Sequence, residues 1–258
     1  MTASSSQNAA RFYDGFAGDY ELVYGGEWER AVDQQAGALD RLIRTNVPHA
    51  GSVLDCACGI GTQAIGLAGL GYRVVGTDLS HGAIDRARHE ARHLGIEASF
   101  DVADFRDLSG IDGEFDVVIA CDNALPHLLE PADVPTVLQQ MRNKLTAEGL
   151  LVVTMRDFDR ALRERPSIAP PLISAGPPRR ILVRLHDWDV DRPCYTVRLI
   201  VLTERHDGWD VTEHTTRFRA ITRAELTRAA TNAGLSDVRW LGESPFIGNQ
   251  QVMTARRS

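Results

Sequence analysis

The stretch from Val53 to Ala64 constrains this chain more than any other part of its sequence. It reads Val-Leu-Asp-Cys-Ala-Cys-Gly-Ile-Gly-Thr-Gln-Ala. The pattern predicts a short apolar strand over 52–54, a tight turn with two glycines, and then a helix. Glycine is needed because such a turn uses backbone angles that a Cβ atom forbids, and because a ligand must approach the bare main chain. In an open α/β sheet, the crevice beyond this strand is the usual ligand site.

Two classes of ligand compete for this turn. Gly59 and Gly61 satisfy the loose dinucleotide pattern, and Asp78 lies at roughly the spacing of an acid that binds ribose. Asp55 argues against a dinucleotide, because its carboxylate would face the charge of a pyrophosphate. A ligand with an amino acid head and a cationic centre tolerates that acid far better. The residues therefore favour the cationic ligand and keep an NAD(P)-dependent reductase as the alternative.

The run from Leu54 to Thr62 resembles the glycine-rich turn of class I S-adenosylmethionine-dependent methyltransferases. The resemblance implies S-adenosylmethionine as the cofactor and S-adenosylhomocysteine as its product. We expect Asp78 to accept hydrogen bonds from the ribose hydroxyls, Asp104 to accept one from the adenine amino group, and Phe105 to pack on the adenine ring. The residues expected to bind the cofactor from the turn and the strand ends are Asp55, Ala57, Gly59, Gly61, Asp78, Leu79, Asp104, Phe105 and Cys121.

The chain alternates strand-like and helix-like segments, which is typical of a parallel sheet with crossover helices. Strands are expected at 52–54, 72–77, 98–102, 115–120 and 150–154, with helices at 62–70, 81–94 and 133–144. A capping box from Thr222 to Glu225 opens another helix, and strands at 238–241 and 251–255 end the chain, the last one antiparallel. The fold class is therefore α/β: a Rossmann-like, doubly wound, mostly parallel seven-stranded sheet.

The alternation stops after the fifth strand. Residues 157–180 contain five prolines and show no period, so we expect a long loop that acts as a lid. Three strand-like runs at 181–188, 195–204 and 209–219 predict a small antiparallel three-stranded insertion. The expected division is an N-terminal helical cover (1–45), a cofactor-binding domain (46–156 and 220–258), and a lid with a substrate-side insertion (157–219).

The N-terminal region is rich in aromatic residues between positions 11 and 26, and an amphipathic helix follows from Glu27. The tyrosines either pack against the main domain or cover the cofactor. The first ten residues are polar and rich in serine, without the apolar core of a signal peptide. They are expected to form a frayed tail.

Asp122, Asn123 and His127 follow the fourth strand, beside the crevice where chemistry is expected. His127, or a water held by Asp122, could take a proton from the acceptor, so both are candidate catalytic residues. Arg156 follows the fifth strand and can clamp a carboxylate through two hydrogen bonds. Its alternative role is an ion pair with one of three nearby acids, namely Asp122, Asp157 or Asp159.

These segments, over most of 11–255, resemble the glycine/sarcosine N-methyltransferase group. The resemblance implies that Asn123 and Arg156 hold a substrate carboxylate near His127. It also implies that Tyr24 of the cover meets cofactor and substrate, and that Arg30 faces the cofactor carboxylate. The expected acceptor is thus the amine nitrogen of a glycine-like or amino-acid-type small molecule. Cys121-Asp122 replaces a glycine-rich stretch of that group, which keeps O- or C-methylation of a larger specialised metabolite as an alternative.

The composition excludes several other classes of protein. The net charge of −7, without a long Lys/Arg run, argues against nucleic acid binding, and no run of about 18 apolar residues indicates a membrane span. The four cysteines lack C-x-x-C spacing, which favours reduced thiols in the cytoplasm and gives no metal site. A homo-oligomer stays possible, because the resembling family often assembles through its N-terminal segment.

Overall fold

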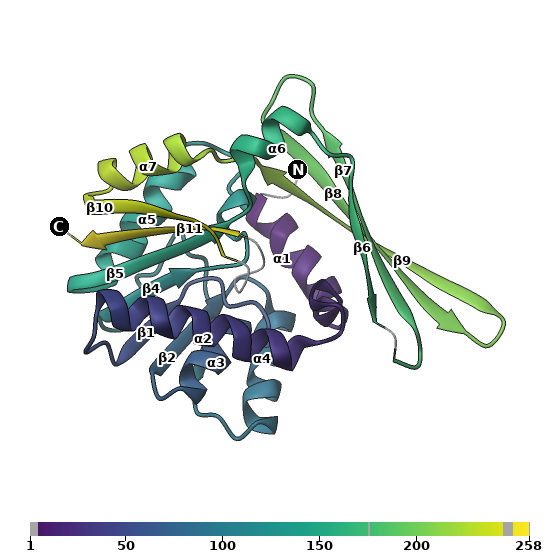
Figure 1. Ribbon diagram of the computed structural model, residues 1–258, viewed down its shortest axis with the longest axis horizontal. Helices are drawn as coiled ribbons and strands as arrows, with labels where there is room; N and C mark the ends of the chain where they lie inside the picture. Colours follow the sequence, from purple (N-terminus) through teal and green to yellow (C-terminus); the bar gives the residue numbers. More distant parts are fainter. Residues whose placement is uncertain (1–4, 175, 245–249, 258) are drawn as a thin grey trace.

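The computed structural model describes residues 5–174, 176–244 and 250–257, which form two separate sheets (Figure 1). The larger sheet has seven strands in the order β10-β11-β5-β4-β1-β2-β3. Strand β11 runs antiparallel to both neighbours, and the other pairs are parallel. The predicted fold class is thereby confirmed. The strands are β1 Ser52–Asp55, β2 Arg73–Asp78, β3 Ser99–Val102, β4 Phe115–Ala120, β5 Leu145–Met155, β10 Leu235–Ser244 and β11 Gln250–Arg257.

Helices cover both faces of this sheet, which explains why its central strands are apolar at consecutive positions. Val53 packs with α2, α3 and α4 on one face, whereas Leu54 faces the layer of α5 and α7 on the other. No helix within the described ranges is long and apolar enough to cross a membrane. The helices are α2 Trp28–Asn46, α3 Thr62–Gly69, α4 His81–His93, α5 Asp133–Asn143 and α7 Arg223–Asn232.

The insertion is a four-stranded antiparallel sheet that projects from the main body (Figure 1). The predicted loop over 157–180 is wrong, because residues 158–164 form a helix and residues 168–174 form a fourth strand, whereas a lid role for this segment stays a prediction. Pro170 and Pro171 lack N–H donors, so they are compatible only with the edge position that β6 occupies, and the pairing with β7 is irregular there. The elements are α6 Phe158–Glu164, β6 Ile168–Ser174, β7 Arg180–Trp188, β8 Cys194–Arg205 and β9 Gly208–Arg219.

The N-terminal segment lies between the main sheet and the insertion. It forms helix α1 (Ser5–Phe16) and a short 3-10 helix, η1 (Tyr20–Tyr24). The expected frayed tail is wrong from Ser5 onward, because α1 is ordered and buries Ala9 and Phe12. Asp14 anchors the helix: its Oδ1 accepts hydrogen bonds from Ser80 Oγ (2.6 Å) and from the N–H of Gly82 (3.0 Å), at the start of α4.

Helices α2 and α3 touch through Gly66, which gives a test of the packing. A Cβ atom on Gly66 would lie 2.5 Å from Ala36 Cβ and 2.9 Å from the backbone oxygen of Val32. Gly66→Ala should therefore lower the free energy of unfolding by about 1–3 kcal/mol, as overpacked cores do. Denaturant titration measures the change.

Gly37 is the matched control, because it also lies inside a helix but has open space around it. Its nearest atom would be Arg41 Nη1, at 3.6 Å. Gly37→Ala should raise the free energy of unfolding by roughly 0.5–1 kcal/mol. Equal effects of the two substitutions would show that the contact between α2 and α3 is not tight.

Candidate active site

The glycine turn joins β1 to α3 in the predicted way. Gly59 and Gly61 have φ angles of +53° and +90°, in the left-handed region that favours glycine. A Cβ atom on Gly61 would lie only 2.8 Å from Ile65 Cδ1, so the helix could not pack as closely. The N–H of Cys58 donates to the carbonyl oxygen of Thr77 at 2.9 Å, which ties the turn to β2.

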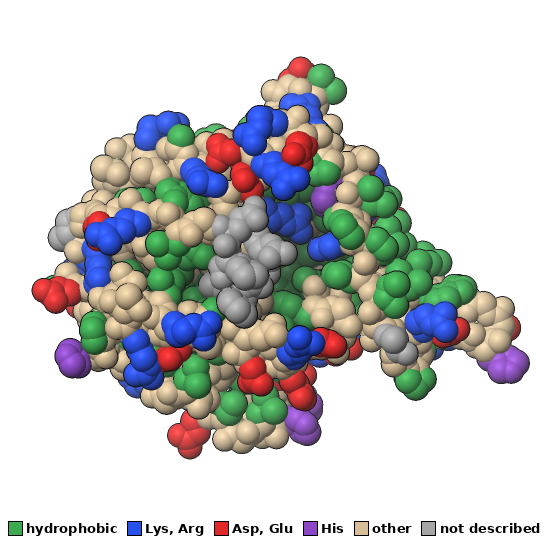
Figure 2. All heavy atoms as spheres, in the orientation of Figure 1, with side chains coloured by type: hydrophobic (Ala, Val, Ile, Leu, Met, Phe, Trp, Pro, Cys, Tyr) green, Lys and Arg blue, Asp and Glu red, His purple; other side chains and the backbone are tan. Residues whose placement is uncertain are grey.

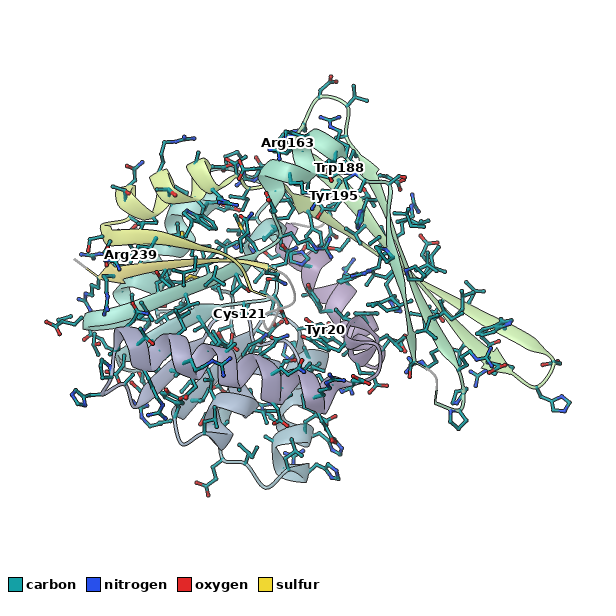
Figure 3. The ribbon with its side chains drawn as sticks, in the orientation of Figure 1. Tyr20, Cys121, Arg163, Trp188, Tyr195 and Arg239 are labelled. Carbon is teal, nitrogen blue, oxygen red and sulfur yellow. The ribbon has the colours of Figure 1, made fainter. Side chains whose placement is uncertain are left out.

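A cavity opens at this edge of the sheet. Its walls come from the glycine turn, the ends of β2 and β4, and the N-terminal cover. Figure 3 shows Tyr20 of the cover and Cys121 of the sheet at this edge. The lining residues that the sequence analysis proposed for the cofactor are Ala57, Gly59, Asp78, Leu79, Phe105 and Cys121.

Asp78 is the acid that lines this cavity at the end of β2. Its Oδ2 accepts the N–H of Gly59 and its Oδ1 accepts the N–H of Ser80, both at 2.9 Å. Burial raises the pKa of the carboxyl group, and these N–H donors oppose that rise. Each oxygen can accept a further hydrogen bond, so Asp78 can hold ligand hydroxyl groups while it shapes the glycine turn.

Asp55 is fully buried behind the same turn. Its Oδ1 accepts the N–H of Ala57 at 3.3 Å, and its Oδ2 has no partner among the described residues. Burial raises the pKa of Asp55 to about 8. The hydrogen bond from the Ala57 N–H opposes this rise, and the negative charges of Asp78 and Asp122 add to it. Three acids thus surround the turn, an environment that repels a pyrophosphate and suits a cationic ligand.

A second cavity lies between the N-terminal cover, the ends of β4 and β5, and the insertion. Tyr13, Tyr20 and Asp122 line both cavities. Ligands in the two cavities would therefore meet at these three side chains. We call the first the cofactor cavity and the second the acceptor cavity.

The turn after β4 holds a strained backbone between the two cavities. Asp122 and Asn123 have φ angles of 52° and 70°, which are uncommon outside glycine and often mark functional sites. Thr154 of β5 fixes this turn: Asp122 N donates to its Oγ1 (3.0 Å) and Asn123 N donates to its carbonyl oxygen (3.2 Å). Asn123 Oδ1 in turn accepts the N–H of Arg156 at 3.1 Å, so Asn123 and Arg156 lie together as predicted.

The carboxylate of Asp122 is surrounded by donors from distant parts of the chain. Tyr24 donates its hydroxyl at 2.6 Å, Gln63 its amide at 2.9 Å, and Gln250 its amide at 3.3 Å. Burial raises the pKa of Asp122, while these donors favour its ionised form.

His127 lies at the wall of the cofactor cavity, beside the cover. Its Nε2 shares a hydrogen bond of 2.8 Å with the Tyr13 hydroxyl, and its ring packs edge-on against Phe218, with 4.5 Å between ring centroids. Burial lowers the pKa of His127 to about 3, so the ring is neutral at pH 7.

Arg156 lines the acceptor cavity, and none of the described carboxylates forms an ion pair with it. Asp157 instead accepts the N–H of Arg160 as the N-cap of α6, and Asp159 accepts the N–H of Arg223. The alternative role of Arg156 in an ion pair with Asp122, Asp157 or Asp159 is therefore wrong.

Four predicted cofactor residues lie outside the walls of both cavities. Arg30 is exposed on α2 and pairs with Glu27 at 2.9 Å. The Asp104 carboxylate is held by Arg106, whose Nη2 donates to Oδ2 at 2.7 Å, and only its neighbours Ala103 and Phe105 line the cofactor cavity. Asp55 and Gly61 likewise shape the turn from outside the cavity wall.

Several residues that line the cavities give little or no signal of this position in the sequence. Gln63 lies two residues after the second glycine of the turn, and this position could have indicated that its side chain lines the site. The aromatic run of the N-terminus includes Tyr13 and Tyr20, but nothing in the sequence distinguishes these two from the other aromatic residues of the run. Arg184 gave no signal, because arginine on a strand of the insertion is ordinary on an exposed face.

Comparison with known proteins places this site in a family. A profile described as a methyltransferase domain matches residues 53–149, from β1 into β5. The chain is 34% identical over 162 residues to the glycine/sarcosine N-methyltransferase of Parasynechococcus marenigrum, spanning 61% of this chain and 57% of that protein. It is 32% identical over 162 residues to the 2-heptyl-1-hydroxyquinolin-4(1H)-one methyltransferase of Mycobacteroides abscessus, spanning 62% of this chain and 68% of that protein.

The fold resembles that of solved methyltransferase structures over nearly the whole chain. The structure of an amino pentose methyltransferase from Micromonospora echinaspora with bound S-adenosylmethionine matches with a TM-score of 0.74 and 20% identity, over 93% of this chain and 96% of that chain. The chain belongs to the class I S-adenosylmethionine-dependent methyltransferases. The predictions of this family and of S-adenosylmethionine as its cofactor are confirmed, and the NAD(P)-dependent alternative loses its support. The names of the relatives specify different acceptors, so the family alone does not fix the acceptor.

Asp55 gives a prediction for the pH dependence of stability. Its pKa is raised to about 8 in the folded chain, whereas an unfolded aspartate has a pKa of about 3.9. The stability that the protonated form contributes is complete below about pH 4 and is lost as the pH rises through about 8. Asp55→Asn, which cannot ionise, should lose less free energy of unfolding between acidic and alkaline pH than the wild type. The control is Asp101→Asn on β3, an exposed acid, and equal losses in the wild type and Asp55→Asn would contradict the assignment.

Asp78 gives a prediction for cofactor binding. Asp78→Asn should weaken S-adenosylhomocysteine about tenfold or more, because hydrogen bonds to a charged group each contribute about 1.5–3 kcal/mol. Calorimetric titration measures the affinity, with NADH as the ligand that should give no comparable response. Asp101→Asn should bind as the wild type does. Unchanged affinity in Asp78→Asn would show that Asp78 does not bind the ribose hydroxyls.

Proposed function

We propose that this chain transfers a methyl group from S-adenosylmethionine to the amine nitrogen of an amino-acid-type small molecule. The observation that carries the proposal is the pairing of two cavities that share Tyr13, Tyr20 and Asp122, with Arg156 in the second cavity and no described acid paired to it. An arginine without a counter-charge, beside a pocket, suits a ligand carboxylate. The name of the glycine/sarcosine relative agrees with such an acceptor.

The cofactor cavity fits S-adenosylmethionine in charge and shape. The carboxylate of Asp78 provides negative charge on one side, and Leu79 and Phe105 provide apolar surface on the other. In this proposal Asp78 binds the ribose hydroxyls and Phe105 packs on the adenine.

The chemistry supplied by bound S-adenosylmethionine is transfer of a methyl group from a positively charged sulfur to a nucleophile. The residues of the chain then have to align the acceptor and exclude water. Arg156 and the side-chain amide of Asn123 hold the carboxylate. Asp122 lies in the wall that the two cavities share, so its negative charge favours the positive charge that develops on the acceptor nitrogen.

The acceptor amine must also lose a proton. Of the two predicted catalytic residues, Asp122 is the better proton acceptor, directly or through a water, because burial raises its pKa. Burial lowers the pKa of His127 to about 3, which disfavours its protonated form. In this proposal His127 holds the Tyr13 hydroxyl of the cover in place at 2.8 Å.

One observation favours a second candidate function. Apolar side chains make up much of the wall of the acceptor cavity, including Phe12, Phe16, Val197 and Phe218. Such a cavity also suits O- or C-methylation of a larger metabolite, as the name of the quinolinone relative indicates for that protein.

Arg156 separates these two functions. In a screen of amino acids, amines and phenols with S-adenosylmethionine, an amino acid should be methylated better than its carboxamide. Arg156→Lys keeps the charge but loses the planar fork, so it should raise the KM of that amino acid roughly tenfold or more. Arg156→Ala should remove the preference for the carboxylate. The affinity for S-adenosylhomocysteine should hardly change.

Arg163 is the matched control, because it is exposed on α6 and donates to the backbone oxygen of Asp159 at 2.8 Å. Figure 3 shows its position on that outer helix. Arg163→Lys should leave the KM unchanged. If the wild type does not distinguish the amino acid from its amide, the carboxylate clamp is wrong, and the larger metabolite becomes the leading acceptor.

A further inference from the structure

The acceptor cavity contains a second arginine, on the insertion. Arg184 projects from β7 into the cavity that Arg156 enters from the end of β5. Its Nη2 donates to the backbone oxygen of Pro170 at 3.1 Å, but its Nε is buried without a hydrogen-bond partner. No acid within the described parts of the chain pairs with Arg184. Figure 2 shows Lys and Arg side chains gathered beside the hollow between the main body and the insertion.

The two arginines influence each other. Burial, together with the positive charge of Arg156, lowers the pKa of Arg184 to about 10. Two like charges in one partly buried cavity repel each other unless an anion lies between or beside them. The neighbouring His186 adds no charge at neutral pH, because burial and the charge of Arg156 lower its pKa.

The remaining polar groups of the cavity point to the same kind of ligand. Asn123 is only 5% exposed, and its Nδ2 has no partner, so it offers an unused donor beside Arg156. Asp122 is the carboxylate in the cavity wall, and it is already engaged by Tyr24, Gln63 and Gln250. The two buried polar atoms of the cavity lining that have no partner, Asn123 Nδ2 and Arg184 Nε, are therefore both donors. A single carboxylate would leave one guanidinium without a counter-charge, which is costly in a buried site.

We propose that the acceptor carries a second negative charge, as an acidic amino acid or a phosphate ester does, and that Arg184 binds it while Arg156 and Asn123 hold the carboxylate. The inference rests on the proposed methylation of an amino-acid-type acceptor and narrows its substrate class. It makes Arg184 the residue that selects between singly and doubly anionic acceptors.

Matched pairs of probes test this selection. L-Aspartate and L-asparagine have nearly the same shape but differ by one charge, and O-phospho-L-serine and L-serine differ by a phosphate. Calorimetry in the presence of S-adenosylhomocysteine gives the affinity of each probe, and methyl transfer from S-adenosylmethionine gives its turnover. The wild type should bind the more charged member of at least one pair about tenfold or more tightly. The pair that responds identifies the source of the charge.

Three variants assign the preference to Arg184. Arg184→Gln should bring the two members of the pair close to equal affinity, and Arg184→Lys should keep part of the preference. Arg198→Gln should keep all of it, because Arg198 is exposed on β8 and pairs with Asp187 and Glu213 at 2.8 and 3.0 Å. Unchanged affinity for S-adenosylhomocysteine in Arg184→Gln shows that the fold and the cofactor cavity are intact.

The outcomes separate this inference from the proposed function. Equal binding of both members of both pairs by the wild type overturns the inference, as does a preference that persists in Arg184→Gln. If singly charged amino acids are then still methylated, the proposed function stands without it. Charge-dependent binding that depends on Arg184, without methyl transfer to any amine, supports the two-arginine site and contradicts the proposed amine methylation.

Discussion

The buried carboxylate of Asp122 connects the parts of the site. It accepts hydrogen bonds from Tyr24 of the N-terminal cover, Gln63 of the helix after the glycine turn, and Gln250 of the last strand. An ionised group away from bulk water requires such donors, because burial without them would be costly. The cover, the central crevice and the C-terminal strand therefore meet at one carboxylate, and the strained turn that carries Asp122 is fixed by Thr154 of β5.

Charge is distributed unevenly between the two cavities. Acids surround the cofactor cavity, where Asp55 and Asp78 lie beside the glycine turn, whereas Arg156 and Arg184 lie in the acceptor cavity. This arrangement suits a cationic donor on one side and an anionic acceptor on the other. In the proposed methyl transfer, Asp122 would lie between the two ligands, where positive charge would pass from the donor to the acceptor.

The insertion and the N-terminal cover depend on each other. Arg180 of β7 pairs with Asp19 and Glu21 of the cover, and Glu21 also pairs with Arg86 of α4 at 3.2 Å. Partly exposed ion pairs of this kind contribute little individually. Burial of Phe12 and Phe16 of the cover supplies the larger part of the attachment, because apolar burial stabilises by about 1.5–3 kcal/mol for each large side chain. The acceptor cavity is formed by this docking, since both elements line it.

The sequence by itself determined the main sheet, the glycine turn and the cofactor class. These features depend on local periodicity and on residues a few positions apart, such as Gly59 and Gly61, whose backbone angles only glycine adopts easily. It also brought Asn123 and Arg156 together, because the carboxyl ends of adjacent parallel strands meet at one edge.

Only the tertiary structure decided the rest. The prolines of β6 concealed an edge strand, since an edge position needs no donor on one side. The first helix lacks a strong local signal and becomes ordered by packing between two sheets. Arg184 shares a cavity with Arg156 only because the insertion folds over it. Asp104 pairs with Arg106 and Arg30 pairs with Glu27, and the cofactor roles of Asp104 and Arg30 stay predictions. Contacts between residues far apart in the chain fix these features, and no local pattern records them.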